Sequence, residues 1–174
     1  VAMWVKADAS QVTYADIIDN GHSNLPYRSW CVEYLNTGLR FVWGLFCTGS
    51  RTAAVEFDLK TNTWQYLVLT LDSNRVAQVY LDGQLQGFAV LSGPISYDGS
   101  QSLSLGRMAI GWRPFKGLLD EVDIYNRALS ATEIQAIYAA GSAGKCKTVP
   151  PSLLSQPAPR TVYVGETVTF SVAA

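Results

Sequence analysis

Short runs in which apolar and polar residues alternate make up most of the chain. Within residues 39–46, for example, Leu39, Phe41, Trp43 and Leu45 would fall on one face of an extended strand. Turn-forming residues separate such runs at intervals of about 8–12 residues, a spacing typical of β-sandwiches and barrels. The pattern predicts an all-β fold with strands at residues 1–6, 14–19, 30–35, 39–46, 64–71, 76–81, 85–90, 103–106 and 118–125.

Two of the connections between these runs have the sequence of a tight turn. Asp82-Gly83 separates residues 76–81 from residues 85–90. A type I′ turn needs positive φ at both central positions, and Asp-Gly adopts this conformation readily. Asn36-Thr37-Gly38 divides the two runs on either side of it in the same way. Both segments are therefore predicted to form β-hairpins.

One helix is predicted after the last strand. Ser130 is followed three residues later by Glu133, the spacing of a capping box, in which each side chain accepts a hydrogen bond from the other residue's backbone N–H. Leu129 and Ile134 occupy the two positions of a hydrophobic staple, and Gly141 is a natural end for the helix. We expect this short helix to lie on the sandwich and to have a structural role.

The composition changes at residue 141. Residues 1–140 are predicted to form one domain, and the Gly, Ser, Lys and Pro residues of 141–151 are typical of a linker. Residues 152–174 contain Thr-Val-Tyr-Val-Gly-Glu-Thr-Val-Thr-Phe-Ser-Val, an alternation that resembles two opening strands of an immunoglobulin-like module. So short a segment cannot bury a core of its own, and we expect a truncated immunoglobulin-like stub.

The composition allows a buried core and argues against several kinds of partner. Hydrophobic residues make up 48% of the 174 residues and charged residues 16%, so a disordered chain is not expected. The net charge is -1 and Lys and Arg form no cluster, so nucleic acid is not a predicted partner. No apolar run reaches the ~18 residues that predict a membrane span.

A long motif ends the predicted domain. Residues 115–134 read Phe-Lys-Gly-Leu-Leu-Asp-Glu-Val-Asp-Ile-Tyr-Asn-Arg-Ala-Leu-Ser-Ala-Thr-Glu-Ile, which resembles the C-terminal signature of laminin-G-like jelly rolls of the concanavalin-A-like lectin/glucanase superfamily. Shorter matches precede it in the family's order: Trp-Val-Lys at residues 4–6, Tyr-Leu-Asp-Gly at 80–83 and Leu-Gly-Arg at 105–107. The resemblance implies a two-sheet antiparallel jelly-roll sandwich with one short C-terminal helix.

The chain departs from the family at its beginning. Members usually carry further strands before the Trp-Val-Lys strand, whereas residue 1 of this chain already lies in a predicted strand. We therefore expect N-terminal strands to be missing, which would leave either a gap in the sheet or an incomplete sandwich.

The resemblance also implies a function. We expect a non-catalytic extracellular recognition module that binds glycan or matrix ligands within a larger secreted or cell-surface protein. Two alternatives stay open, because this fold serves lectins, enzymes and inert spacers alike. One is a structural or adhesive protein–protein spacer, and the other is an accessory domain of a carbohydrate-active enzyme.

Acidic residues of the last strand raise the question of catalysis. Retaining glycosidases need two carboxylates about 5–5.5 Å apart. Glu121 and Asp123 would share a face, but the next position on that face is Tyr125, so an enzyme is not predicted. Asp120 is expected on the opposite face, where the resemblance implies a Ca²⁺ site built from six to eight oxygen ligands. No other cofactor is predicted.

Cysteine pairing is open. Simple hairpin pairing would place Cys31 opposite residues 42–44, too far from Cys47 for a disulfide. Cys146 could pair with either of them, and three unpaired thiols are an equal alternative.

Aromatic residues in or beside loops are the ligand-binding candidates, because exposed rings stack on the apolar faces of sugars. These candidates are Tyr27, Trp30, Tyr97 and Trp112.

Other residues with distinctive side chains are assigned structural roles. Trp4, Trp43 and Trp64 lie in strand patterns and are predicted to belong to the core. His22, the only histidine, lies in a polar turn and is predicted to be exposed and without a functional role.

Overall fold

The computed structural model describes residues 1–21, 28–47, 50–96, 102–108, 111–141 and Gly165. The chain divides into two units, Val1–Ser142 and Ala143–Ala174. All helices and strands of the described residues belong to the first unit. The predicted linker at 141–151 and the predicted immunoglobulin-like stub at 152–174 lie outside the described residues, apart from Gly141 and Gly165, and stay predictions.

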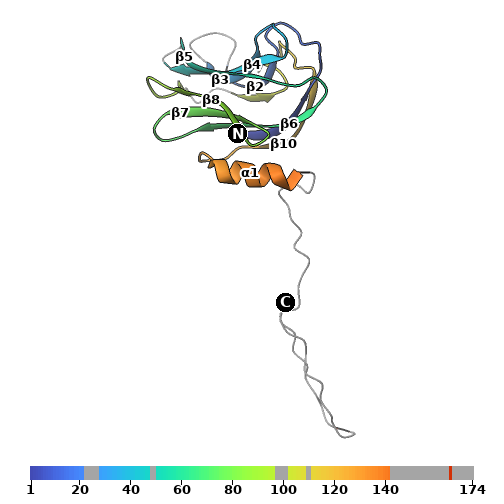
Figure 1. Ribbon diagram of the computed structural model, residues 1–174. Helices are drawn as coiled ribbons and strands as arrows, with labels where there is room; N and C mark the ends of the chain where they lie inside the picture. The colour runs from blue at the N-terminus through green and yellow to red at the C-terminus, as the bar shows by residue number, and fades with distance from the viewer. Residues whose placement is uncertain (22–27, 48–49, 97–101, 109–110, 142–164, 166–174) are drawn as a thin grey trace. The chain divides into compact units, whose positions relative to one another are not determined.

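Two antiparallel sheets lie face to face in the first unit (Figure 1). The first has the strand order β10-β1-β6-β7-β8 and the second the order β5-β4-β3-β2-β9. The strands of the first sheet are β1 (Ala2–Ala7), β6 (Trp64–Leu71), β7 (Val76–Leu81), β8 (Gln84–Val90) and β10 (Gly117–Asp123). Those of the second are β2 (Asp16–Gly21), β3 (Arg28–Tyr34), β4 (Arg40–Cys47), β5 (Ser50–Asp58) and β9 (Leu103–Leu105).

These sheets and one short helix, α1 (Ala131–Ala140), confirm the predicted jelly-roll sandwich. The expected gap is not found in the described residues, because β1 pairs with β6 on one side and with β10 on the other. In the described part of the chain, no helix has the length and apolar character needed to cross a membrane.

The main core lies between the two sheets and follows the alternation of each strand. Met3 and Val5 of β1 meet Leu67 of β6 in this core, together with Phe41 and Leu45 of β4. All five side chains are at most 1% exposed. Burying an aliphatic side chain of this size stabilises a fold by about 1.5–3 kcal/mol, so this layer is the main source of stability.

Strand β5 was not predicted. Its inward side chains are Ala53, Val55 and Phe57, which are buried, whereas Thr52 and Glu56 are exposed. The alternation is therefore regular, but the small alanine weakens the apolar contrast on which the prediction depends. As the outer strand of the second sheet, β5 pairs only with β4.

The helix covers the outer face of the first sheet (Figure 1). Ile134, which is fully buried, and Leu129 pack with Tyr66 and Val68 of β6 in a second apolar cluster. Trp4 lies against this cluster, with its ring centroid 5.2 Å from that of Tyr66. Trp4 therefore packs under the helix, half-buried, and not between the sheets as the core assignment predicted.

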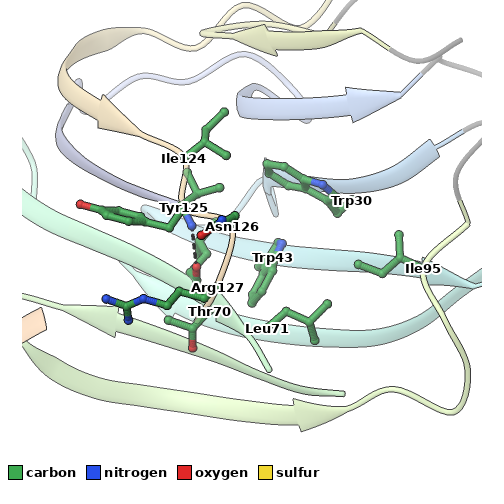
Figure 2. Close-up of a pocket in the computed structure, with 11 residues that line it drawn as sticks. Trp30, Trp43, Thr70, Leu71, Ile95, Ile124, Tyr125, Asn126 and Arg127 are labelled. Carbon is green, nitrogen blue, oxygen red and sulfur yellow. Dashed lines mark hydrogen bonds between the residues drawn. The ribbon is translucent and has the colours of Figure 1, made fainter. Parts of the chain in front are cut away.

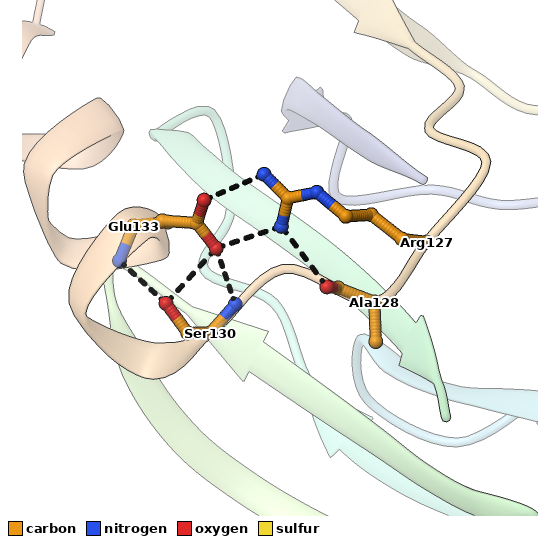
Figure 3. A network of polar contacts seen from close by, with 4 residues as sticks. All are labelled: Arg127, Ala128, Ser130 and Glu133. Carbon is orange, nitrogen blue, oxygen red and sulfur yellow. Dashed lines mark hydrogen bonds and ion pairs between the residues drawn. The ribbon is translucent and has the colours of Figure 1, made fainter. Parts of the chain in front are cut away.

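The predicted capping box is confirmed and extends to an arginine of the family motif. The Ser130 side chain accepts a hydrogen bond from Glu133 N at 3.3 Å, and Glu133 Oε2 accepts one from Ser130 N at 2.9 Å. Arg127 donates to the two oxygens of Glu133 at 2.9 and 2.6 Å and to the carbonyl of Ala128 at 3.3 Å (Figure 3). The network ties the chain that leaves β10 to the first turn of α1.

Both hairpin predictions agree with the observed strands. Asp82 and Gly83 have φ of 51° and 78°, as a type I′ turn requires. Strands β3 and β4 pair so that Cys31 lies opposite Gly44, within the predicted range. Cys31 and Cys47 are both buried, and no disulfide joins them to each other. Cys146 lies outside the described residues, and its pairing stays open.

Candidate functional site

Polar side chains gather on the outer face of the second sheet. Val32 of β3 points into the core, so its neighbours Cys31 and Glu33 point to the opposite face. Cys31 is fully buried and Glu33 is 4% exposed, and two aspartates of β2 beside them are fully buried as well. We call this set the polar stripe; its members are Asp16, Asp19, Cys31, Glu33, Arg51 and Arg113.

Glu33 holds two arginines that come from distant parts of the chain. Arg51 of β5 forms an ion pair with Glu33 Oε1. Arg113, from the segment before β10, lies 3.5 Å from Glu33 Oε2. The carboxylate is almost enclosed, at 5% exposure of its side chain, whereas the arginines are 36% and 33% exposed. Each guanidinium has five N–H donors, so both arginines keep donors for a ligand at the surface.

Local structure fixes the direction of both arginines. A Cβ atom at Gly44 would lie 3.0 Å from Arg51 Nε, so this glycine leaves the space in which Arg51 crosses β4. The Arg51 guanidinium lies 5.6 Å from the centre of the Phe46 ring. The guanidinium of Arg113 lies 5.1 Å from the centre of the Tyr14 ring. Such cation–π contacts orient the planar groups beside aromatic faces.

Two exposed aromatic rings are associated with the stripe at the Arg113 end. Tyr14, beneath the Arg113 guanidinium, is 45% exposed, and Trp112 is 72% exposed. The turn that presents Trp112 is closed by two backbone hydrogen bonds of 2.9 Å, from Met108 N to Trp112 O and from Gly111 N to Met108 O. The result is a surface that offers both ring faces and guanidinium donors.

The predicted ligand-binding aromatics are not all brought together. Trp112 is exposed beside Arg113, as a loop aromatic should be. Trp30 instead faces the interior, is half-buried and packs against the main core. Tyr27, Tyr97 and also His22 lie outside the described residues. The role of these candidates in ligand binding stays a prediction.

Trp30 lines an end pocket between the sheets with a volume of about 310 Å³ (Figure 2). Trp43 of β4 lies deeper in this end pocket and is 5% exposed, so its predicted place in the core is confirmed. The remaining lining residues are Val1, Leu69, Thr70, Leu71, Ile95, Ile124, Tyr125, Asn126 and Arg127.

A second hollow lies beside α1, around Asp120. This side pocket, of about 360 Å³, is lined by Trp4, Trp64, Asp120, Glu121 and Gly141. Trp64 is 40% exposed, so its assignment to the core is wrong. The reason is its position at the start of β6, on the outer face, where it borders the side pocket and does not join the cluster under α1.

The expectation that Asp120 and Glu121 point to opposite faces is also wrong. The register between β1 and β10 shifts between the pairs Ala2–Asp123 and Trp4–Asp120, which marks a β-bulge with one extra residue in β10. Glu121 has φ of 46°, which breaks the strand alternation. Both carboxylates therefore border the same side pocket.

Acidic residues on both sheets are candidate metal ligands. In the described ranges, the group that could hold an ion is Asp16, Asp19 and Cys31, whose ligand atoms lie within 4.8 Å of one another. A thiol does not suit Ca²⁺, which binds oxygen. Asp120 belongs to no such group of described residues, and its Oδ1 accepts a hydrogen bond from Glu121 N at 2.8 Å. Asp120 and Glu121 are the two acidic residues in the lining of the side pocket, and a site of six to eight ligands would need further oxygens.

Sequence reasoning missed Tyr14, Glu33, Arg51 and Arg113. They are far apart in the sequence. The pairing of β2, β3, β4 and β5 brings Glu33 and Arg51 together, and a bridge from Asp16 to Pro114 brings in Arg113. One local signal was present: Glu33 is a charged residue on an otherwise apolar strand, and a buried charge needs a partner.

Comparisons with known proteins agree with this architecture. A family model described as the concanavalin A-like lectin/glucanases superfamily matches residues 1–135. No protein with a curated description matches the chain.

Three solved structures illustrate the similarity of fold. The receptor binding domain of botulinum neurotoxin type G has a TM-score of 0.59 and 18% identity over 79% of this chain and 36% of that one. The binding domain of Paraclostridial Mosquitocidal Protein 1 has a TM-score of 0.61 and 15% identity over 79% and 35%. Domain 4 of AbnA, a GH43 extracellular arabinanase from Geobacillus stearothermophilus solved with arabinotriose, has a TM-score of 0.55 and 24% identity over 78% and 63%.

The chain thus spans about a third of the length of the two toxin domains and 63% of the arabinanase domain. At these identities, the likeness concerns the fold.

Proposed function

Because the chain belongs to the concanavalin A-like lectin/glucanases superfamily, we propose that it is a non-catalytic glycan-binding module. The observation that carries the proposal is the pair of arginines held by the enclosed carboxylate of Glu33 beside two exposed aromatic rings. We assign the ligand to the surface formed by the polar stripe with Tyr14 and Trp112.

The chemistry of this surface suits a sugar. A guanidinium presents parallel N–H donors, which match two neighbouring hydroxyl oxygens. Because Glu33 already orients each guanidinium, the arginine side chains lose less conformational entropy when a ligand binds. The exposed ring of Trp112 offers a stacking face for the C–H groups of a sugar ring. The stripe contains three carboxylates and two arginines, so a neutral glycan fits it better than a strongly anionic one.

The neighbouring structures support a module that serves a larger protein. One is a domain of an extracellular arabinanase in complex with arabinotriose, and another is a receptor binding domain. By this likeness we propose a place in a secreted or cell-surface protein, with arabino-oligosaccharides as the first ligands to test. The arabinanase neighbour favours one version of this proposal, in which the chain is an accessory domain of a carbohydrate-active enzyme.

The carboxylates of β10 support a non-catalytic role. Asp123 accepts a hydrogen bond from the hydroxyl of Tyr125 at 3.4 Å. Glu121 is exposed on the bulge, on the strand at the edge of the first sheet. A retaining pair needs two enclosed carboxylates of different pKa facing one bond, and these two residues are not arranged in that way.

The test is a glycan-array screen followed by titration calorimetry with the best ligand. The Trp112→Ala variant is expected to bind about twofold to tenfold more weakly, because stacking contributes about 0.5–1.5 kcal/mol. Trp64→Ala removes an exposed tryptophan on the other sheet and serves as the matched control. Loss of binding in the control alone would move the glycan site to the side pocket, and no binding to any glycan would favour an adhesive spacer.

A further inference from the structure

The end pocket differs in chemistry from the proposed glycan surface. It opens between the two sheets, beside the ends of β3 and β6, and most of its lining side chains are apolar (Figure 2). A volume of about 310 Å³ lies at the lower end of the range for small-molecule pockets and suits one bicyclic ring system.

One buried donor in this pocket has no acceptor. Trp43 is 5% exposed, and among the described residues no hydrogen-bond partner reaches its indole Nε1. Figure 2 shows the indole nitrogen on the side of the ring toward Trp30. Buried donors are almost always satisfied in folded proteins, so an unmet N–H in a pocket wall points to a ligand acceptor.

Two polar residues at the rim are already engaged. The terminal N–H groups of Arg127 donate hydrogen bonds to Glu133 and to the carbonyl of Ala128. The hydroxyl of Tyr125 donates to Asp123. A sugar in this pocket would face mostly apolar side chains, and burying an unpaired hydroxyl is costly. An apolar molecule with a single acceptor avoids that loss.

We propose that the end pocket binds a small apolar ring compound whose one oxygen acceptor receives a hydrogen bond from Trp43 Nε1. Trp30, which is half-buried, lines the pocket on the side of the indole nitrogen. The apolar walls of Leu69, Leu71 and Ile95 then enclose the rings. This site is separate from the glycan surface and does not depend on the proposed function.

The experiment compares two matched probes, the bicyclic ketone 1-indanone and the hydrocarbon indane, which lacks the oxygen. Binding to the full chain is followed by the indole N–H signals in a ¹H–¹⁵N NMR spectrum. The ketone is expected to bind about fivefold to tenfold more tightly than indane, the factor expected for one hydrogen bond in a buried site. The Trp43 indole signal should shift downfield.

Variants of the pocket separate the hydrogen bond from the packing. Trp43→Phe removes the N–H but keeps an aromatic ring, so its preference for the ketone should disappear. Ile95→Phe fills the pocket from the loop and leaves Trp43 in place, so it should abolish binding of both probes. Trp64→Phe, in the side pocket, should change nothing.

Three outcomes would overturn the proposal. Equal affinity of the two probes would show that the Trp43 N–H is not used. Unchanged binding in Ile95→Phe would place the probe elsewhere. Shifts of the Trp30 and Trp43 signals with arabinotriose, but not with indanone, would assign this pocket to a sugar.

Discussion

Arg127 and Glu133 form a two-pronged ion pair, with their nitrogen–oxygen contacts at 2.9 and 2.6 Å (Figure 3). The same carboxylate accepts two hydrogen bonds from Ser130, from its backbone N–H and from its hydroxyl, both at 2.9 Å. The arginine, serine and glutamate of the C-terminal family motif therefore act as one structural unit. Their role is to fasten α1 to the strand before it.

This arrangement predicts a loss of stability in acid. The hydrogen bond from Arg127, with those from Ser130, lowers the pKa of Glu133 from its usual 4.5 to about 2. Because the folded-state pKa is the lower one, the stabilisation is complete above about pH 4.5 and is lost as the pH falls towards 2. Melting temperatures of the wild type and Glu133→Gln should differ near neutral pH and converge near pH 2.

The control for that experiment is Glu56→Gln, which removes an exposed glutamate 3.8 Å from Arg40. Its melting curve should follow that of the wild type across the same pH range. If the gap between the wild type and Glu133→Gln stays constant down to pH 2, the proposed ionic role of Glu133 is wrong.

Gly117 of the family motif is expected to tolerate no side chain. A Cβ atom there would lie 2.3 Å from the carbonyl oxygen of Lys6 and 2.6 Å from the Phe115 ring. Because Lys6 O is backbone in the neighbouring strand, Gly117→Ala must push β10 away from β1, at a cost of about 2 kcal/mol or more. Urea unfolding monitored by tryptophan fluorescence measures this loss in the free energy of unfolding.

Gly38 provides the comparison, because a Cβ atom there meets nothing within 4 Å and only its φ of 55° opposes the change. Gly38→Ala should cost about 1 kcal/mol. Equal losses for the two variants would refute the steric explanation for Gly117.

Glu33→Gln should lower both stability and glycan affinity. The change leaves Arg51 and Arg113 without their carboxylate, and removing one member of a buried ion pair costs about 3–5 kcal/mol. Since both arginines are about a third exposed and keep solvent contact, we expect about 1–2 kcal/mol. Calorimetry of the folded variant should show weaker binding of the glycan, and unchanged affinity would separate the polar stripe from the ligand.

Calcium dependence is a separate prediction of the family resemblance. If Asp120 ligates Ca²⁺, glycan binding and melting temperature of the wild type should fall in EDTA and be restored by Ca²⁺, and Asp120→Asn should be insensitive to both. An unchanged affinity and melting temperature in EDTA would contradict this prediction.

Features set by neighbours in the sequence were predictable. The capping box at Ser130 and Glu133 and the turn at Asp82-Gly83 depend on a few consecutive residues, and both are present as expected. The alternation of apolar residues also located most strands. It failed for β5, where Ala53 replaces a larger apolar residue, because the contrast between the two faces became too weak.

Features that depend on contacts between distant segments were not predictable from the sequence. Alternation places Trp64 on the same face as Tyr66, but it does not reveal that α1 covers Tyr66 and leaves Trp64 exposed. The bulge likewise turned Glu121 to the same face as Asp120. The polar stripe joins residues from four separate segments, so only the strand order brings Arg51 and Arg113 to Glu33.

The position of β1 has a consequence for how the domain acquires its structure. The first strand lies between β6 and β10, so Val5 is paired with Gln65 on one side and Leu119 on the other. During synthesis, β1 can pair along its second edge only after β10 has left the ribosome, when nearly the whole domain has been made. Such non-local pairing slows folding and leaves apolar edges exposed meanwhile. The domain should therefore fold late and as a unit, and truncation before β10 should yield a chain that aggregates.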